Sequence, residues 1–200
     1  MTGLPKTLMP RIAPPGPSAA HEQGATGGAA KDPSAGRNLL FLREAELRLA
    51  QDLLFFGYRD FTAGADAILA GLGMGRAHHR VLHFVGRRPG ITVGELLGIL
   101  GITKQSLGRV LTPLIDEGYV TQAPGQSDRR QRLLSLTPKG AALERSLFDR
   151  QRETVMQAYR EAGPQAVEGF RRVMRGLMGP DARAALARLE ARGTGGEGTE

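Results

Sequence analysis

The feature that most constrains the fold is a pair of helix-start signals separated by a glycine turn. Thr92 and Glu95 have the spacing of a capping box, and Thr103 can cap a second helix. Gly101 lies between the two segments, and Gly118 follows the second as a left-handed helix stop. We therefore expect two short helices, joined by a tight turn at 101–102. Their apolar positions recur at helical spacing, at Val93, Leu96, Leu97 and Leu100 and then at Leu107, Val110, Leu111, Leu114 and Ile115.

A hairpin pattern follows directly. Residues 119–122 and 133–136 are expected to be strands, with Pro, Gly, Ser and Asp in the turn between them. Thr137 and Pro138 then begin another helix. Together with a shorter helix at 75–87, this order is that of a helix-turn-helix followed by a wing. The sequence thus predicts a mainly α fold with a small β wing, in which residues 75–140 form a winged helix-turn-helix DNA-binding domain.

The first turns of the second helix carry residues suited to reading DNA. An α-helix fits the major groove of B-DNA, and its N-terminal residues meet the edges of the bases. Glutamine can pair with adenine and arginine with guanine, while serine and threonine can bond a base or a phosphate. A solvated polar helix face is the alternative interpretation. The candidate DNA-binding residues are Thr103, Lys104, Gln105, Ser106 and Arg109.

The hairpin tip is the second candidate contact, because Arg129, Arg130 and Arg132 cluster there. An arginine in the narrow minor groove meets concentrated negative potential. Asp128 would weaken such a grip unless its carboxylate orients one guanidinium by a bidentate pair, and we expect it to be this wing-orienting residue. The alternative is a charged turn that is only solvated.

The charge balance favours a nucleic-acid partner. The chain has a net charge of +7, and arginine, which binds phosphate and guanine better than lysine, supplies 23 of its 27 basic residues. A coding bias toward arginine is the alternative. The absence of cysteine excludes disulfides, thiolate zinc sites and cysteine-based redox switches. No apolar run approaches the roughly 18 residues needed to span a bilayer, and the N-terminus lacks the apolar stretch of a signal peptide, so we expect a cytoplasmic protein.

The segments outside the DNA-binding domain are expected to be tails and dimerisation helices. Residues 1–36 and 193–200 are low in complexity and are predicted to be disordered tails. Residues 37–74 predict an N-terminal dimerisation helix, and residues 141–192 predict C-terminal dimerisation helices broken at 163–164 and 179–180. Burial within one chain is the alternative to a contact between subunits. The expected dimer-interface residues are Leu40, Leu47, Leu54, Phe61, Leu186 and Leu189.

Small residues accompany the large ones along the first of these helices. Leu40, Leu47, Leu54, Phe61 and Ile68 recur every seven residues, and Ala50, Gly57, Gly64 and Gly71 lie three positions after the last four of them. Glycine inside a helix costs about 1 kcal/mol relative to alanine. A close contact with another helix would explain why the glycines are there.

The sequence resembles the MarR family of bacterial transcriptional regulators in two segments, "GITVGELLGILGITKQSLGRVLTPLIDEGYV" and "SDRRQRLLSLTPKG". The resemblance as a whole covers about residues 38–190. Its most specific part is the wing, with Asp128, Arg130, the strand end at 134–137 and Gly140. The resemblance implies a homodimer whose first and last helices intertwine. It also implies that the recognition helix enters the major groove, that Arg130 enters the adjacent minor groove, and that Arg129 and Arg132 contact phosphates.

The same resemblance implies a ligand-responsive repressor that binds a pseudopalindromic operator and needs no cofactor. A small-molecule effector, often a phenolic anion, would release it from double-stranded DNA. The candidate ligand-binding residues are Phe56, Arg59, His79 and His83, although core or surface roles for them are the alternative. Pro113 departs from the pattern, since it removes a bond to the carbonyl of Arg109 and should kink the recognition helix.

Three other functions can be weighed. A metal-responsive regulator is one, since His79 and His83 lie one helical turn apart, although no cysteine can complete a site and we expect no metal. A winged helix that binds protein is another, but it would not need three wing arginines. An enzyme is the third: the glycines of "GLGMGR" lack the spacing and the preceding strand of a nucleotide-binding loop, and no other catalytic motif is present, so we expect no enzyme.

Overall fold

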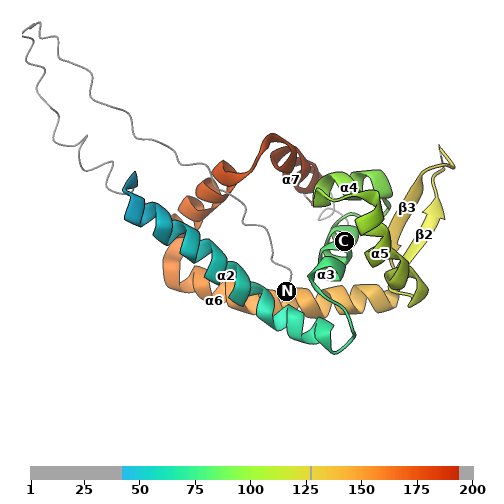
Figure 1. Ribbon diagram of the computed structural model, residues 1–200, viewed down its shortest axis with the longest axis horizontal. Helices are drawn as coiled ribbons and strands as arrows, with labels where there is room; N and C mark the ends of the chain where they lie inside the picture. Colours follow the sequence, from blue (N-terminus) through green and yellow to red (C-terminus); the bar gives the residue numbers. More distant parts are fainter. Residues whose placement is uncertain (1–41, 127, 194–200) are drawn as a thin grey trace, which may run out of the picture. The chain divides into compact units, whose positions relative to one another are not determined.

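Helices dominate the structure, and most of them start and stop at the residues that the sequence marks. The computed structural model describes residues 42–126 and 128–193. The chain divides into two units, residues 1–47 and 48–200, and of the first only residues 42–47 are described. The elements are α2 (Glu44–Ala70), α3 (Arg76–Arg87), β1 (Ile91–Thr92), α4 (Val93–Leu100), α5 (Lys104–Asp116), β2 (Val120–Pro124), β3 (Arg132–Leu136), α6 (Pro138–Leu177) and α7 (Pro180–Gly193) (Figure 1).

The expected helix-turn-helix is present, and its caps are formed. The Thr92 hydroxyl accepts from the Glu95 backbone N–H at 3.1 Å, while the Glu95 carboxylate accepts from the Thr92 N–H at 2.9 Å. Thr103 caps α5, and Gly101 and Gly118 take the left-handed conformation at the two helix ends. The prediction of a mainly α fold with a small wing is confirmed.

The sheet contains one strand that was not predicted. Its order is β1-β3-β2 and both pairings are antiparallel, with Ile91 opposite Leu134 and Val120 opposite Leu136. Strand β1 has two residues, so it is too short to show an alternating pattern in the sequence. Its effect is to fix the start of α4 to the base of the wing.

The core lies between the helix-turn-helix, the sheet and the first half of α6. Ile91, Leu96, Leu107, Leu114 and Leu134 are fully buried there, and α3 contributes Leu82 and Val85. Burial of a leucine side chain is worth about 1.5–3 kcal/mol. The buried residues lie on the faces that the sequence predicts for α4 and α5, and the other predicted positions on those faces are partly buried: Val93, Leu97, Leu100, Val110 and Ile115.

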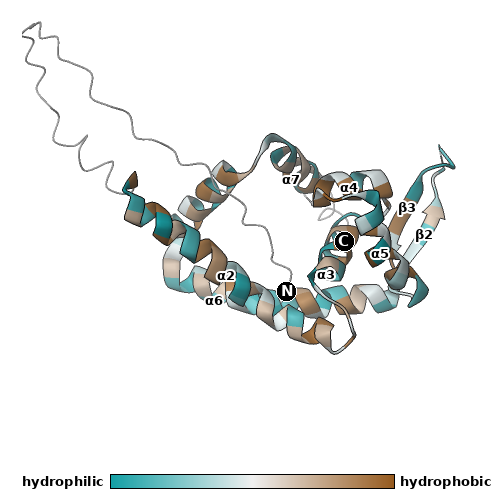
Figure 2. Ribbon diagram, in the orientation of Figure 1, coloured by the Kyte–Doolittle hydropathy of each residue, from teal (hydrophilic) through white to brown (hydrophobic). Residues whose placement is uncertain are grey.

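Helix α2 is buried only near its C-terminal end, at Thr62, Ala65 and Leu69. Leu47 and Leu54 are 50% and 44% exposed, and hydrophobic and hydrophilic residues alternate along the rest of the helix (Figure 2). Gly64 lies close to α6 of the same chain, because a Cβ built on it would lie 2.8 Å from the Arg150 side chain. A Cβ on Gly57 would meet nothing within 4 Å.

The breaks predicted in the C-terminal helices are also present. Gly163 interrupts α6 with φ 77° and ψ 167°, and α7 begins at Pro180. Helix α7 packs against α4, and Ala185 of α7 is buried. Helix α5 continues through Pro113 to Asp116, and the Pro113 carbonyl accepts from the Glu117 N–H at 2.9 Å. The proline thus lies in the last turn, away from the first turns that carry the DNA-reading candidates.

Candidate nucleic-acid interface

The first turn of α5 presents its polar side chains to solvent. Thr103, Lys104, Gln105, Ser106 and Arg109 are all exposed, as predicted. The Thr103 hydroxyl accepts from the Ser106 N–H at 3.2 Å, which satisfies one free donor of the first turn. No acidic residue lies in that turn, so the helix dipole and the charge of Lys104 both favour an anion. Leu107, Leu111 and Leu114 hold the opposite face in the core, which fixes the polar face outward.

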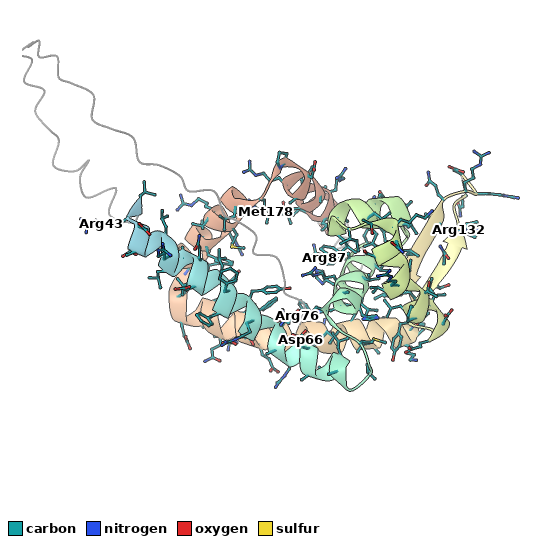
Figure 3. All side chains as sticks on the ribbon, viewed as in Figure 1. Arg43, Asp66, Arg76, Arg87, Arg132 and Met178 are labelled. Carbon is teal, nitrogen blue, oxygen red and sulfur yellow. The ribbon has the colours of Figure 1, made fainter. Side chains whose placement is uncertain are left out.

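The wing arginines are exposed at the hairpin tip. Arg129, Arg130 and Arg132 make no ion pair with any described residue, and Arg132 lies on the wing in Figure 3. Ser127, beside them, lies outside the described residues. Three guanidinium groups that have no ion-pair partner among the described residues are thus exposed at the tip.

Asp128 has a partner other than the one expected. Its carboxylate accepts from the backbone N–H of Arg130 at 2.9 Å, and no bidentate pair with a guanidinium is found within residues 128–193 or 42–126. Aspartate favours this local bond because its short side chain reaches the backbone two residues on. Asp128 therefore shapes the backbone of the tip, and the expected guanidinium pair is corrected to this turn contact.

Gly125 helps to close the tip. Its N–H donates to the Gln131 carbonyl at 3.0 Å, and the Gln131 N–H donates to the Asp128 carbonyl at 3.0 Å. A Cβ on Gly125 would lie 2.7 Å from the Asp128 carbonyl oxygen, so only glycine fits without a shift of the turn. The arginines thus stand on a turn that its own backbone bonds define.

A groove of about 560 Å³ separates α5 from the wing. On the α5 side it is lined by Lys104, Gly108 and Thr112, and on the wing side by Gln122, Arg130 and Arg132. The structure thus brings predicted residues of both elements to one groove. Thr112 and Gln122 were not predicted as site residues, although Thr112 lies eight residues, or about two turns, after Lys104 on the same helix.

The wing is anchored where β2, β3 and α6 meet. The Thr137 hydroxyl donates to the Gly118 carbonyl at 2.6 Å and accepts from the Gly140 N–H at 3.1 Å. The Thr137 N–H donates to the Tyr119 carbonyl at 3.0 Å. A Cβ on Gly140 would lie 1.9 Å from that same oxygen, so glycine is required for this close approach. One joint therefore connects the end of α5, the wing and the long helix α6.

Two of the three histidines of α3, His78 and His83, have polar partners within the described residues. The His78 Nδ1 accepts from the Gly75 N–H at 3.1 Å, which caps the helix. Burial lowers the pKa of His79, and burial with the nearby Arg87 lowers the pKa of His83 to about 4, so that His83 is neutral 3.7 Å from Glu144. Burial raises the pKa of Glu144. Residues 42–126 and 128–193 contain no group of three or more metal-ligating side chains.

The other candidate residues do not line the groove between α5 and the wing. Phe56 is exposed, and the Arg59 guanidinium stacks on its ring at 5.0 Å while pairing with the neighbouring Asp60. Among the expected dimer-interface residues, Phe61, Leu186 and Leu189 are half-buried, and Leu40 lies outside the described residues. No helix of the described part is long and apolar enough to cross a membrane.

Comparisons with known proteins agree with this geometry. A model of the MarR family matches residues 72–131. The chain is 53% identical to the HTH-type transcriptional regulator PetP of Rhodobacter capsulatus over 145 residues, which cover 72% of this chain and 87% of PetP.

Two solved structures show the same fold. A mutant MarR from E. coli complexed with operator DNA is 22% identical, with a TM-score of 0.54, and the similarity covers 70% of this chain and 99% of that one. FabT of Streptococcus pneumoniae in complex with DNA is 17% identical, with a TM-score of 0.59, over 66% of this chain and 94% of FabT. Because the chain is similar to PetP over most of its length and the family model matches its helix-turn-helix, the chain belongs to the MarR family of transcriptional regulators.

Proposed function

We propose that this regulator is a homodimeric, ligand-responsive repressor that binds a pseudopalindromic operator through α5 and the wing. The observation that carries the proposal is the basic groove, in which Lys104 on α5 faces Arg130 and Arg132 on the wing with no acidic residue lining it. Members of this family are DNA-binding transcription regulators and not enzymes.

In the proposed complex, α5 enters the major groove and the wing tip enters the adjacent minor groove. Gln105 and Arg109, exposed in the first turns, would read base edges, while Thr103, Lys104 and Ser106 would bond bases or phosphates. Arg130 would be the minor-groove probe, flanked by phosphate contacts from its neighbours. The solved MarR and FabT complexes contain DNA, which supports this docking by fold.

A second copy of the chain is the proposed cover for the exposed apolar residues of α2. Leu53, Phe55 and Phe56 are 65%, 72% and 56% exposed, and α6 adds Phe170 and Val173 at 52% and 63%. Monomeric proteins seldom expose many large apolar side chains in one patch. A two-fold dimer would place two recognition helices at half-sites about one helical turn apart.

Repression would be relieved by a population shift. A small ligand that binds better to a dimer with a different spacing of its recognition helices would reduce operator binding. Phe56, Arg59, His79 and His83 remain the proposed contacts, because the two half-buried histidines are neutral and can bond an anionic or phenolic ligand by N–H donation. A protein that represses chromosomal operators in this way would work in the cytoplasm.

The test is the Arg130→Ala variant. It should lose about 1–3 kcal/mol of binding free energy for duplexes recovered from a random DNA pool, while the unfolding curve stays that of the wild type. Arg188→Ala, on the exposed surface of α7, is the matched control and should bind as the wild type does. Equal affinities for the Arg130 variant and the wild type would overturn the wing assignment.

A further inference from the structure

We infer that the elbow between α6 and α7 binds a small organic anion with an aliphatic body, such as a short-chain carboxylate. The end of α6 contributes Arg175, Gly176 and Met178 to this site, and α7 contributes Arg183, Leu186 and Glu190. The inference goes beyond the proposed function, because it involves neither the DNA-reading residues nor the ligand candidates on α2 and α3.

The backbone fixes the shape of the elbow. Met178 is extended, with φ −76° and ψ 136°, and its N–H donates to the Arg175 carbonyl at 3.3 Å. Pro180 then begins α7, and the Arg183 N–H donates to the Gly179 carbonyl at 3.1 Å. Figure 3 shows Met178 at this turn. The two helices thus meet at a turn with defined backbone bonds, so a ligand would not have to order the chain there.

The charges at the elbow favour an anion. The Arg183 side chain reaches back across the turn to the Gly176 carbonyl at 3.4 Å, and it has no ion pair within the described residues. Arg175 bonds Glu190 at 2.8 Å, which occupies one of the five N–H donors of its guanidinium. Two arginines against one glutamate leave one net positive charge in the lining. A single carboxylate would complement this charge, since arginine binds carboxylates with two parallel hydrogen bonds.

The apolar part of the lining is aliphatic. Met178 and Leu186 are half-buried, and Ala187 completes the apolar wall. No aromatic side chain is among the lining residues. The volume of about 450 Å³ lies within the range of about 300–1,000 Å³ that small-molecule sites have in proteins. An aliphatic wall next to a guanidinium without an ion pair suits a ligand with a short alkyl chain and one carboxylate.

A small ligand suits the elbow better than a second copy of the chain does. A stable protein interface buries at least about 1,000 Å² and is poor in charged residues at its centre. Three residues of the elbow lining are charged, and all three are exposed: Arg175, Arg183 and Glu190. We therefore assign Leu186, which the sequence placed at the dimer interface, to the ligand site.

Isothermal titration with sodium hexanoate tests the site, and hexanol serves as the uncharged analogue. The wild type should bind one hexanoate per protomer with a dissociation constant of about 1 mM or lower, the strength expected for a ligand of this size. Arg183→Gln should weaken hexanoate binding about tenfold, because it removes a charge-assisted hydrogen bond, and should change hexanol binding much less. Arg188→Gln is the matched control, since Arg188 is an exposed arginine of α7 that does not line the elbow.

A second variant fills the space and leaves the charges in place. Ala187→Phe should abolish the binding of both hexanoate and hexanol, because the larger side chain occupies the apolar wall. Ala184→Phe is its matched control: Ala184 is exposed on α7 and does not line the elbow. Both alanines are exposed, so both variants should melt close to the wild-type temperature.

The outcomes separate the elbow from other places and other occupants. Equal hexanoate affinities in the wild type, Arg183→Gln and Ala187→Phe would overturn the site. Binding that is lost in Arg59→Gln and kept in Arg183→Gln would assign the ligand to the candidates on α2 and α3, and would overturn it too. If the wild type binds no hexanoate up to about 10 mM while Ala187→Phe changes the association state in sedimentation, a second copy covers the elbow and the inference is wrong. None of these readouts uses DNA, so a failure here leaves the proposed function standing.

Discussion

The joint at Gly140 gives the sharpest test of how the wing is held. In Gly140→Ala the new Cβ would lie 1.9 Å from the Tyr119 carbonyl oxygen, where ordinary contact begins at 3.4 Å, so the two backbones must separate by about 1.5 Å. Overpacking of this kind costs about 1–3 kcal/mol. The separation also breaks the 3.0 Å bond from the Thr137 N–H to the same oxygen, which is worth about 1 kcal/mol. Alanine returns at most about 1 kcal/mol of helix propensity.

The net expectation is a loss of about 2 kcal/mol in the free energy of unfolding. Urea unfolding at one fixed protomer concentration would measure it, because the proposed dimer makes stability depend on concentration. Gly98→Ala is the control, since its Cβ has open space, and it should raise stability by about 0.5–1 kcal/mol. A Gly140→Ala protein as stable as the wild type would refute the close approach on which the joint is built.

Three further predictions concern a cap, a buried histidine and the exposed face of α2. Glu95→Ala should lower the free energy of unfolding in urea by about 1–2 kcal/mol, because it removes the capping box with Thr92 and leaves the mostly buried Arg88 without its carboxylate partner. Glu117→Ala is the control and should lower it much less. The free energy of unfolding should fall by about 1–2 kcal/mol between pH 6.5 and pH 4, because the unfolded chain protonates His83 at a higher pH than the folded chain does. This figure is smaller than the full pKa shift implies, because the side chain is 38% exposed and solvent screens it. In His83→Gln the free energy of unfolding should change less over the same pH range. Leu54→Glu should dissociate or unfold the dimer in sedimentation, whereas a folded mutant dimer would contradict the α2 interface.

The sign of the pH effect follows from the direction of the shift. The pKa of His83 is about 4 in the folded state, below the ordinary value of 6.5. Between these two pH values the unfolded state binds the proton and the folded state does not, so the free energy of unfolding falls as the pH falls. Glu144 acts in the opposite sense, because burial raises its pKa and protonation then favours the folded state. If the free energy of unfolding instead rises as the pH is lowered from 6.5 to 4, protonation of Glu144 outweighs protonation of His83.

The parts of the fold that local chemistry determines could be predicted from the sequence. The Thr92 and Thr103 caps and the left-handed Gly101 and Gly118 depend on a few neighbouring residues, so the helix-turn-helix was predicted within a residue or two at its ends. The break at Gly163 was predicted for the same reason. Strand β1 was missed because two residues carry no period, and its place depends on a pairing with β3 distant in sequence.

The candidate site was predicted in its residues more than in its contacts. The exposed first turn of α5 and the basic tip follow from residue type and position. Asp128 was assigned the wrong partner, because a bond to the Arg130 backbone competes with a guanidinium pair and needs less ordering. Thr112 and Gln122 were missed because they belong to different elements, and only the packing of α5 against β2 brings them to one groove.

Selection of bound duplexes from a random DNA pool tests the central claim most directly. A two-fold dimer that reads DNA with α5 and the wing predicts an enriched motif of two inverted half-sites, with centres about 34 Å or one helical turn apart. The enrichment should be lost with Arg130→Ala under the same salt conditions. An asymmetric motif, or enrichment no greater than that from a mock selection, would contradict the account.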